Sequence, residues 1–252
     1  MAGSARAAEA PTLPPYHYPF ADTALAQDLR LKPVVIELFT SLDCLFSPRA
    51  EMLLAEMVQR TAVIGLDCHV DPEGSAYPLA RGFCQTRQQR YHDQSGDEVA
   101  YTPQMVINGQ MTAVGHEFED VRMELARAVL NPPQPVIIRP STQKDVWLID
   151  IPKIALRGSA DILLVTYLPP VTVPKTMPQS LLRTQPLVRV ANQLIPLQGY
   201  DGQARTFSVP FVPSAEAAGF IILVQQDDGQ ILAAGEWKPV SLGNVLNAPL
   251  PN

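Results

Sequence analysis

Two hydrophobic patterns alternate over the first half of the chain. Continuous apolar runs rich in β-branched residues predict buried strands, whereas apolar positions spaced three and four residues apart predict helices. The expected strands are Pro33–Phe39, Ala62–Val70, Met105–Ile107 and Met111–Val114, and the expected helices are Arg49–Arg60, Phe83–His92 and Glu117–Leu130. Asn108 and Gly109 separate the last two strands and predict a tight hairpin turn, so this pair should run antiparallel.

The order of these elements, β-α-β-α-β-β-α, is typical of a thioredoxin-like unit. Its first strand, helix and second strand form a β-α-β segment, which requires a parallel strand pair. A short helix over 21–29 is expected before the first strand. The sequence therefore predicts an α/β fold class with a thioredoxin-like N-terminal domain.

The second half of the chain has a different pattern. After the Pro-rich segment Asn131–Pro135, which is typical of a linker, short runs predict strands and no long helical pattern occurs. The expected strands are Val136–Arg139, Asp145–Ile151, Ala160–Leu168, Leu187–Leu197, Thr206–Phe211, Phe220–Gln226 and Ile231–Ala234. They predict a β-rich region, either a small sandwich or a sheet packed against the first unit.

These patterns divide the chain into four parts. We expect a leader or extended N-terminus at 1–30, a thioredoxin-like domain at 31–131, a β-rich, sandwich-like domain at 136–240 and a tail at 241–252. The first ten residues, MAGSARAAEA, resemble the end of a signal peptide, although the apolar region that would precede a cleavage site is missing. They predict a periplasmic or secreted protein, and an ordinary flexible Ala-rich terminus is the alternative.

Composition narrows the class of protein. The 252 residues are 46% hydrophobic and 17% charged, which fits a folded protein with a substantial core. The net charge of −6 and the lack of a Lys/Arg cluster argue against a nucleic-acid partner. No uninterrupted apolar stretch approaches the roughly 18–20 residues that span a bilayer, so we expect no transmembrane segment.

The candidate chemistry centres on Cys44, which lies between the first strand and the first long helix. A sulfur at a helix N-terminus is near unpaired amide donors, which favour a reactive thiolate. Ser47 stands where a dithiol protein would carry its second cysteine; it can hydrogen-bond the thiolate but cannot resolve a mixed disulfide. A nearby Asp43 carboxylate would oppose a low thiol pKa. The alternative is a cysteine that only packs.

Thr102 and Pro103 precede the third expected strand. In a thioredoxin-like fold, a cis proline at this place lies against the active sulfur, so we expect a cis bond and include Pro103 with Cys44 and Ser47 in the candidate catalytic site. An ordinary trans proline that starts an edge strand is the alternative.

Asp67, His69 and Asp71 alternate at the end of the second strand and should share one face beside the site. His69 could shuttle protons or bind a metal; a hydrogen-bonded structural histidine is the alternative. A soft metal such as copper could use Cys44 with His69 or His116, but no tight ligand spacing supports such a site. We therefore expect no resident metal and no cofactor.

The other two cysteines, Cys68 and Cys84, fall on the second strand and at the start of the next helix. They could form a structural disulfide in an oxidising compartment. Two buried thiols, or a disulfide between Cys44 and one of them, are the alternatives.

The motifs together resemble the bacterial exported thioredoxin-like family catalogued as domain of unknown function 1223. The matching segments are VVIELFTSLDCLFSPR, His69-Val70-Asp71, the Arg87–Tyr91 helix, Tyr101–Val106, Asn108-Gly109, Leu197–Gly202 and Ile222–Gln226. The resemblance implies a thioredoxin-like domain with a β-rich extension in an exported protein, and it implies no activity. In place of the family's cysteine and proline, this chain has Ser47 and Arg49, so a dithiol oxidoreductase is not expected.

Two functions follow from these residues. The first is an exported thioredoxin-fold protein that uses Cys44 in monothiol exchange or captures a partner protein as a mixed disulfide. The alternative is a non-catalytic binding or assembly module, with the partner held by the surface of the β-rich domain. A copper-handling role through Cys44 and His69 is a third hypothesis.

Overall fold

The first half of the chain forms a four-stranded mixed sheet in the computed structural model, which describes residues 24–70, 79–96, 99–175 and 182–239. Its strands are β1 (Val34–Thr40), β2 (Val63–His69), β3 (Gln104–Ile107) and β4 (Met111–Val114). They lie in the order β2-β1-β3-β4, with β1 and β2 parallel and the other pairs antiparallel. The parallel pair and the hairpin are those that the sequence predicted.

The hairpin turn follows from its two residues. Asn108 and Gly109 both have positive φ, of 50° and 74°, which is the left-handed backbone that a two-residue hairpin turn requires. The Asn108 side chain also accepts a hydrogen bond of 2.9 Å from the backbone N–H of Val35, so the turn is tied to β1.

Helices cover both faces of this sheet. They are α1 (Ala24–Leu31), α2 (Ser47–Arg60), α3 (Gly82–Ser95) and α4 (Phe118–Ala128). Alternate residues of β1 point to opposite faces: Ile36 and Leu38 join one core with α1, α2 and α4, and Val35 and Phe39 join a second core with α3. Within the described residues, no helix is both long enough and apolar enough to cross a membrane.

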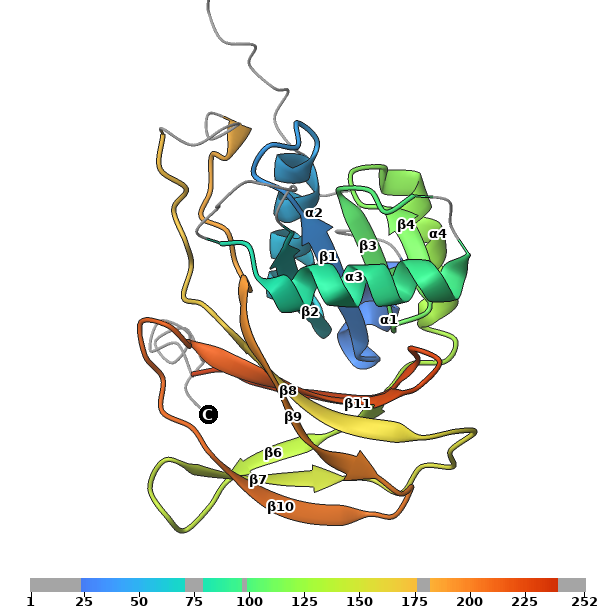
Figure 1. The fold of residues 1–252 in the computed structure, drawn as a ribbon, viewed down its shortest axis with the longest axis vertical. Helices are drawn as coiled ribbons and strands as arrows, with labels where there is room; N and C mark the ends of the chain where they lie inside the picture. Colours follow the sequence, from blue (N-terminus) through green and yellow to red (C-terminus); the bar gives the residue numbers. More distant parts are fainter. Residues whose placement is uncertain (1–23, 71–78, 97–98, 176–181, 240–252) are drawn as a thin grey trace, which may run out of the picture.

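The second half of the chain forms two further sheets (Figure 1). Their strands are β5 (Gln134–Pro135), β6 (Ile137–Pro140), β7 (Val146–Ile151), β8 (Ala160–Tyr167), β9 (Ala191–Tyr200), β10 (Arg205–Pro210), β11 (Gly219–Gln226) and β12 (Ile231–Trp237). The orders are β5-β12-β11-β8-β9 and β10-β7-β6. A core that contains Ile149, Ile162 and Phe220 lies between the two sheets, so they form a small sandwich.

The five-stranded sheet also packs against the first sheet. Leu163 and Leu223 share a buried core with Val35 and Phe39. At the edge of β2, the backbone N–H of Asp67 donates to the carbonyl of Arg189, which lies two residues before the start of β9. The structure therefore combines the two arrangements that the sequence offered as alternatives, a sandwich and a sheet packed on the first unit.

A buried charged group crosses this contact. We call Glu37, Arg87, Tyr91 and Gln225 the Glu37 cluster. Arg87 donates to both carboxylate oxygens of Glu37, at 2.6 and 2.8 Å, and to the side-chain carbonyl of Gln225 at 3.0 Å. The Tyr91 hydroxyl donates to Glu37 and accepts from Gln225. The cluster links β1 and α3 to β11, and the sequence placed these residues only in separate elements.

Several boundaries differ from those expected. Helix α2 begins at Ser47, two residues before the predicted start, and α1 buries Ala26 and Leu29 at the end of the predicted leader. The strand expected to begin at Leu187 begins at Ala191 and extends to Tyr200, because Leu187 pairs only with Val171 in an isolated bridge. Most of the predicted leader, and the predicted tail, lie outside the described residues.

Candidate functional site

Cys44 lies in the turn between β1 and α2. Its backbone N–H donates to the carbonyl of Ser41 at 3.2 Å, and the N–H of Asp43 donates to the Ser41 hydroxyl at the same distance. Pro48 occupies the first turn of α2, where its missing N–H leaves no intrahelical bond unmade. Helix α2 carries no side-chain cap, so its first amides are free to face the turn.

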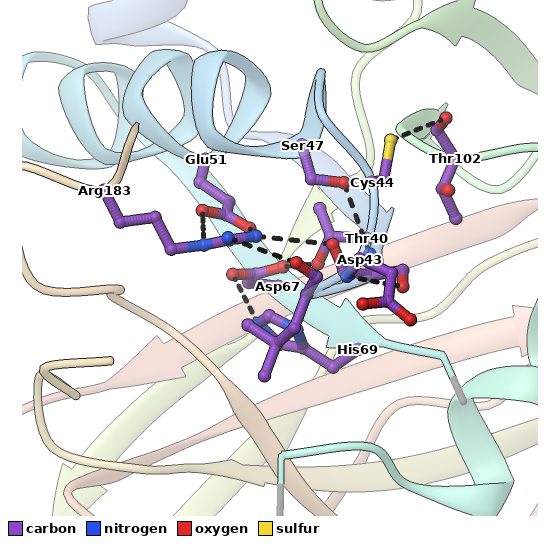
Figure 2. Close-up of polar contacts among 11 residues, drawn as sticks. Thr40, Asp43, Cys44, Ser47, Glu51, Asp67, His69, Thr102 and Arg183 are labelled. Atoms are coloured by element: carbon purple, nitrogen blue, oxygen red, sulfur yellow. Dashed lines mark hydrogen bonds and ion pairs between the residues drawn. The ribbon is translucent and has the colours of Figure 1, made fainter. Parts of the chain in front are cut away.

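The sulfur of Cys44 is partly exposed and faces the segment before β3. Its thiol donates to the backbone carbonyl of Thr102 at 3.3 Å, and the Thr102–Pro103 peptide bond is cis, as the sequence predicted (Figure 2). The Ser47 hydroxyl lies on the other side and accepts a hydrogen bond of 3.2 Å from the N–H of Ser41. The structure thus brings Cys44, Ser47, Thr102 and Pro103 together.

The surroundings of Cys44 favour its thiolate. Burial raises the pKa of the Cys44 thiol, but hydrogen bonds from the Ser47 hydroxyl, the Phe46 amide, the Thr102 side chain and the Ser47 amide lower it, and the net pKa lies below the usual value. Asp43 is exposed, and the largest contributions to the pKa of the Cys44 thiol come from burial and from hydrogen bonds of Ser47, Phe46 and Thr102.

Two exposed apolar side chains adjoin the sulfur in sequence. Leu45 and Phe46 are 56% and 52% exposed, so two apolar side chains that follow Cys44 in the sequence are open to solvent. The Phe46 ring stacks on the His116 ring, with centroids 4.5 Å apart and an interplanar angle of 17°. His116 Nε2 in turn lies 3.2 Å from a carboxylate oxygen of Glu117. His116 therefore belongs to the rim of the site and holds Phe46 in place.

A buried charged group lies under the Cys44 turn. We call Glu51, Asp67, His69 and Arg183 the Glu51 cluster (Figure 2). Arg183 donates to both carboxylate oxygens of Glu51, at 2.8 and 2.7 Å, and His69 Nε2 lies 3.2 Å from Asp67. Asp67 also accepts from the Thr40 hydroxyl at 2.7 Å. Asp67 and His69 share a face, as the alternation predicted, whereas Glu51 and Arg183 were not identified from the sequence.

Burial governs the protonation of this cluster. It raises the pKa of Glu51 to about 7, with a further contribution from the Asp67 carboxylate that Arg183 and His69 oppose. For His69, burial lowers the pKa, but the adjacent Asp67 and Glu51 carboxylates outweigh it and the net change is upward. The Glu51 carboxyl therefore holds a proton that titrates close to neutral pH.

The same cluster contains the candidate metal ligands. Ligand atoms of Glu51, Asp67 and His69 lie within 4.8 Å of one another, and His69 Nδ1 is buried without a hydrogen-bond partner. The Arg183 guanidinium already balances the Glu51 carboxylate, so a cation is not needed to neutralise the group. Among the described residues, Cys44 and His69 do not form a ligand group with a third residue, and the predicted neighbour Asp71 lies outside them.

The remaining cysteines form a disulfide. Cys68 on β2 is bonded to Cys84 in the first turn of α3, with their Cα atoms 5.4 Å apart, and Cys44 is the free cysteine. Both bonded residues are buried in the core shared with the five-stranded sheet. Of the alternatives considered from the sequence, the structure contains the Cys68–Cys84 disulfide, with Cys44 left as a thiol.

Fold and site together define a mixed α/β protein with one free, partly exposed cysteine above a buried charged cluster. The chain belongs to the family described as Protein of unknown function (DUF1223), whose model matches residues 35–225.

Solved structures similar to this chain include the following two. A protein from Agrobacterium tumefaciens has a TM-score of 0.68 and 25% identity, over 87% of this chain and 97% of that one. HBP35 of Porphyromonas gingivalis has a TM-score of 0.53 and 12% identity, over 88% of this chain and 80% of that one, which is a likeness of fold alone. No match was found among curated proteins.

Proposed function

We propose that residues 31–131 form a thioredoxin-like unit and that the protein carries out monothiol thiol–disulfide exchange through Cys44. The observation that carries this proposal is the environment of the sulfur, which is partly exposed, has a lowered thiol pKa and lies between Ser47 and the Thr102 carbonyl. The element order and the turn between β1 and α2 support the thioredoxin-like assignment.

The exchange step conserves atoms and electrons. The Cys44 thiolate attacks one sulfur of a partner disulfide and forms a new S–S bond with it. The partner's own S–S bond breaks, and its second sulfur leaves as a thiolate that takes up a proton. No net oxidation occurs, because one disulfide replaces another.

Release of the partner requires a second thiol. Ser47 has no sulfur, so the attacking thiol must come from the partner or from a small thiol such as glutathione. The Ser47 hydroxyl instead stabilises the Cys44 thiolate. An exported location agrees with this chemistry, since the Cys68–Cys84 disulfide is of the kind that persists in oxidising compartments.

Incubation with glutathione disulfide at pH 7, followed by intact-mass spectrometry without reduction, tests the proposal. We expect one glutathione on Cys44, removed by added reduced glutathione, and none on Cys44→Ser. Ser47→Cys restores a second sulfur three residues away, so we expect an internal disulfide with Cys44 in place of the stable adduct. A wild-type protein that acquires no glutathione would overturn the proposal.

A non-catalytic binding or assembly module is the second candidate. It is favoured by the exposed side chains of Leu45 and Phe46 beside a sulfur whose partner cysteine is replaced by Ser47. In that case a partner protein captured by the wild type would be retained equally by Cys44→Ser and lost by Phe46→Ser. Under monothiol exchange, capture would instead depend on Cys44 and be reversed by reduction.

A further inference from the structure

Arg183 joins the β-rich half of the chain to the Cys44 turn. It lies between β8 and β9, and its side chain, only 2% exposed, reaches under the turn (Figure 2). One guanidinium nitrogen donates to the Ser41 carbonyl at 3.3 Å, and another lies 3.5 Å from the Leu42 carbonyl. Two of the nitrogens also donate to Glu51 on α2.

These contacts reach the two elements that lie beside the Cys44 sulfur, the turn before it and helix α2. The Ser41 carbonyl accepts hydrogen bonds from both the Arg183 guanidinium and the N–H of Cys44, so the two groups share one acceptor. Glu51 stands one helical turn after Ser47, whose hydroxyl and amide lower the thiol pKa of Cys44. A guanidinium suits this place because its planar fork can bond a carboxylate with two nitrogens and still reach a carbonyl.

We propose that Arg183 is a positioning residue for Cys44: it clamps the carbonyls of the turn to α2, and so keeps the amide and hydroxyl donors of α2 aimed at the sulfur. The β-rich half then controls the reactivity of a thiol that belongs to the first sheet. The inference rests on the proposed function only in treating Cys44 as the working thiol.

The test is the pH profile of Cys44 alkylation by iodoacetamide, which requires no disulfide partner. Because Cys44 is the free cysteine, each incorporated label reports this site. In Arg183→Met we expect the alkylation midpoint to move to higher pH by about one pH unit, since the donors no longer face the thiolate. Arg183→Lys should move it less, because an ammonium keeps the charge but loses the fork.

Arg189→Met is the matched control. Arg189 lies in the same segment, and its largely buried guanidinium binds Glu236 at 2.7 Å, on the side of Tyr167 rather than the Cys44 turn. We expect this variant to lose stability in urea but to keep the wild-type alkylation midpoint. Should Arg183→Met fail to fold, Arg183→Gln, which keeps polar donors in the site, is measured in its place with the same expectation.

Three results would overturn the inference: a wild-type midpoint in the Arg183 variants, an equal shift in Arg189→Met, or a wild-type Cys44 that iodoacetamide does not modify. Failure of the proposed function looks different. In that case the wild-type thiol is alkylated with a lowered midpoint and responds to Arg183, yet glutathione disulfide forms no adduct.

Discussion

The first sheet carries a buried charged cluster on each face, and the two clusters differ in how completely their polar atoms are paired. In the Glu37 cluster, the buried side-chain nitrogens and oxygens of all four members have hydrogen-bond partners. In the Glu51 cluster, neither ring nitrogen of His69 has a hydrogen-bond partner, although Nε2 lies 3.2 Å from Asp67, and Glu51 carries a pKa raised to about 7. Both clusters join the first sheet to the β-rich half, but only the second lies under a free thiol.

This difference in pairing indicates that the two buried charged clusters have different roles. A fully paired network fixes one arrangement of its elements, and removing a member is costly. A network that contains unpaired nitrogens and an acid that titrates near neutral pH can gain or lose a proton when the pH changes. We therefore assign the Glu37 cluster to holding the two halves together and the Glu51 cluster to the Cys44 site.

The largest expected effect comes from breaking the paired cluster. Arg87→Met leaves the Glu37 carboxylate buried without its cation, so we expect the free energy of unfolding in urea to fall by about 3–5 kcal/mol. The alkylation midpoint of Cys44 should not change, because Arg87 lies on the opposite face. A second change, Glu37→Leu in the Arg87→Met protein, should restore part of the loss, since no charge is then stranded. A loss below about 1 kcal/mol for Arg87→Met would contradict the assignment.

A change of pH should have an effect of intermediate size on the free energy of unfolding. The folded-state pKa of Glu51, about 7, is above its ordinary value of 4.5, so the folded protein binds the proton more tightly. The stabilisation that this proton gives to the folded state is complete below pH 4.5 and is lost as the pH rises through about 7. His69, whose pKa is also raised from its ordinary value of 6.5, adds a loss of stability of the same sign as the pH rises above 6.5.

We expect the wild type to lose about 1–3 kcal/mol of unfolding free energy from this cluster between acid and mildly basic pH. Urea titrations across this range, on the wild type and Glu51→Gln, measure the loss. Glu51→Gln cannot titrate there, so its stability should depend less on pH. Glu56→Gln, on the same helix, is the control and should follow the wild type. An equally steep dependence in Glu51→Gln would show that this acid is not the source.

How much of the fold and of the candidate site could be predicted from the sequence depended on how far apart the contacting residues lie along the chain. The strand at Val34–Thr40 and the cysteine after it are visible locally, because an apolar run and a turn motif are contiguous. The shared face of Asp67 and His69 follows from strand alternation. These parts of the fold and site were therefore accessible from the sequence.

The Glu51–Arg183 pair was not accessible, because its members are 132 positions apart and nothing local marks Arg183. Glu51 did carry a signal: it stands three residues before Leu54 and seven before Val58, on the buried stripe of α2. A charged residue on such a stripe indicates a buried partner, although the sequence does not say which one. Glu37 carries the same kind of signal, because a carboxylate within an apolar strand also indicates a buried partner that the sequence does not identify.

The smallest effect concerns Ser47, the residue that replaces a cysteine in this site. Ser47→Ala removes the hydroxyl that stabilises the Cys44 thiolate and accepts from the Ser41 N–H. Because one hydrogen bond contributes about 1 kcal/mol, we expect the alkylation midpoint of Cys44 to rise by about 0.5–1 pH unit, with a stability loss of about 1 kcal/mol. Ser95→Ala, an exposed hydroxyl on α3, is the control and should change neither. An unchanged midpoint in Ser47→Ala would mean that the backbone amides alone stabilise the thiolate, and Ser47 would then be a residue of the turn only.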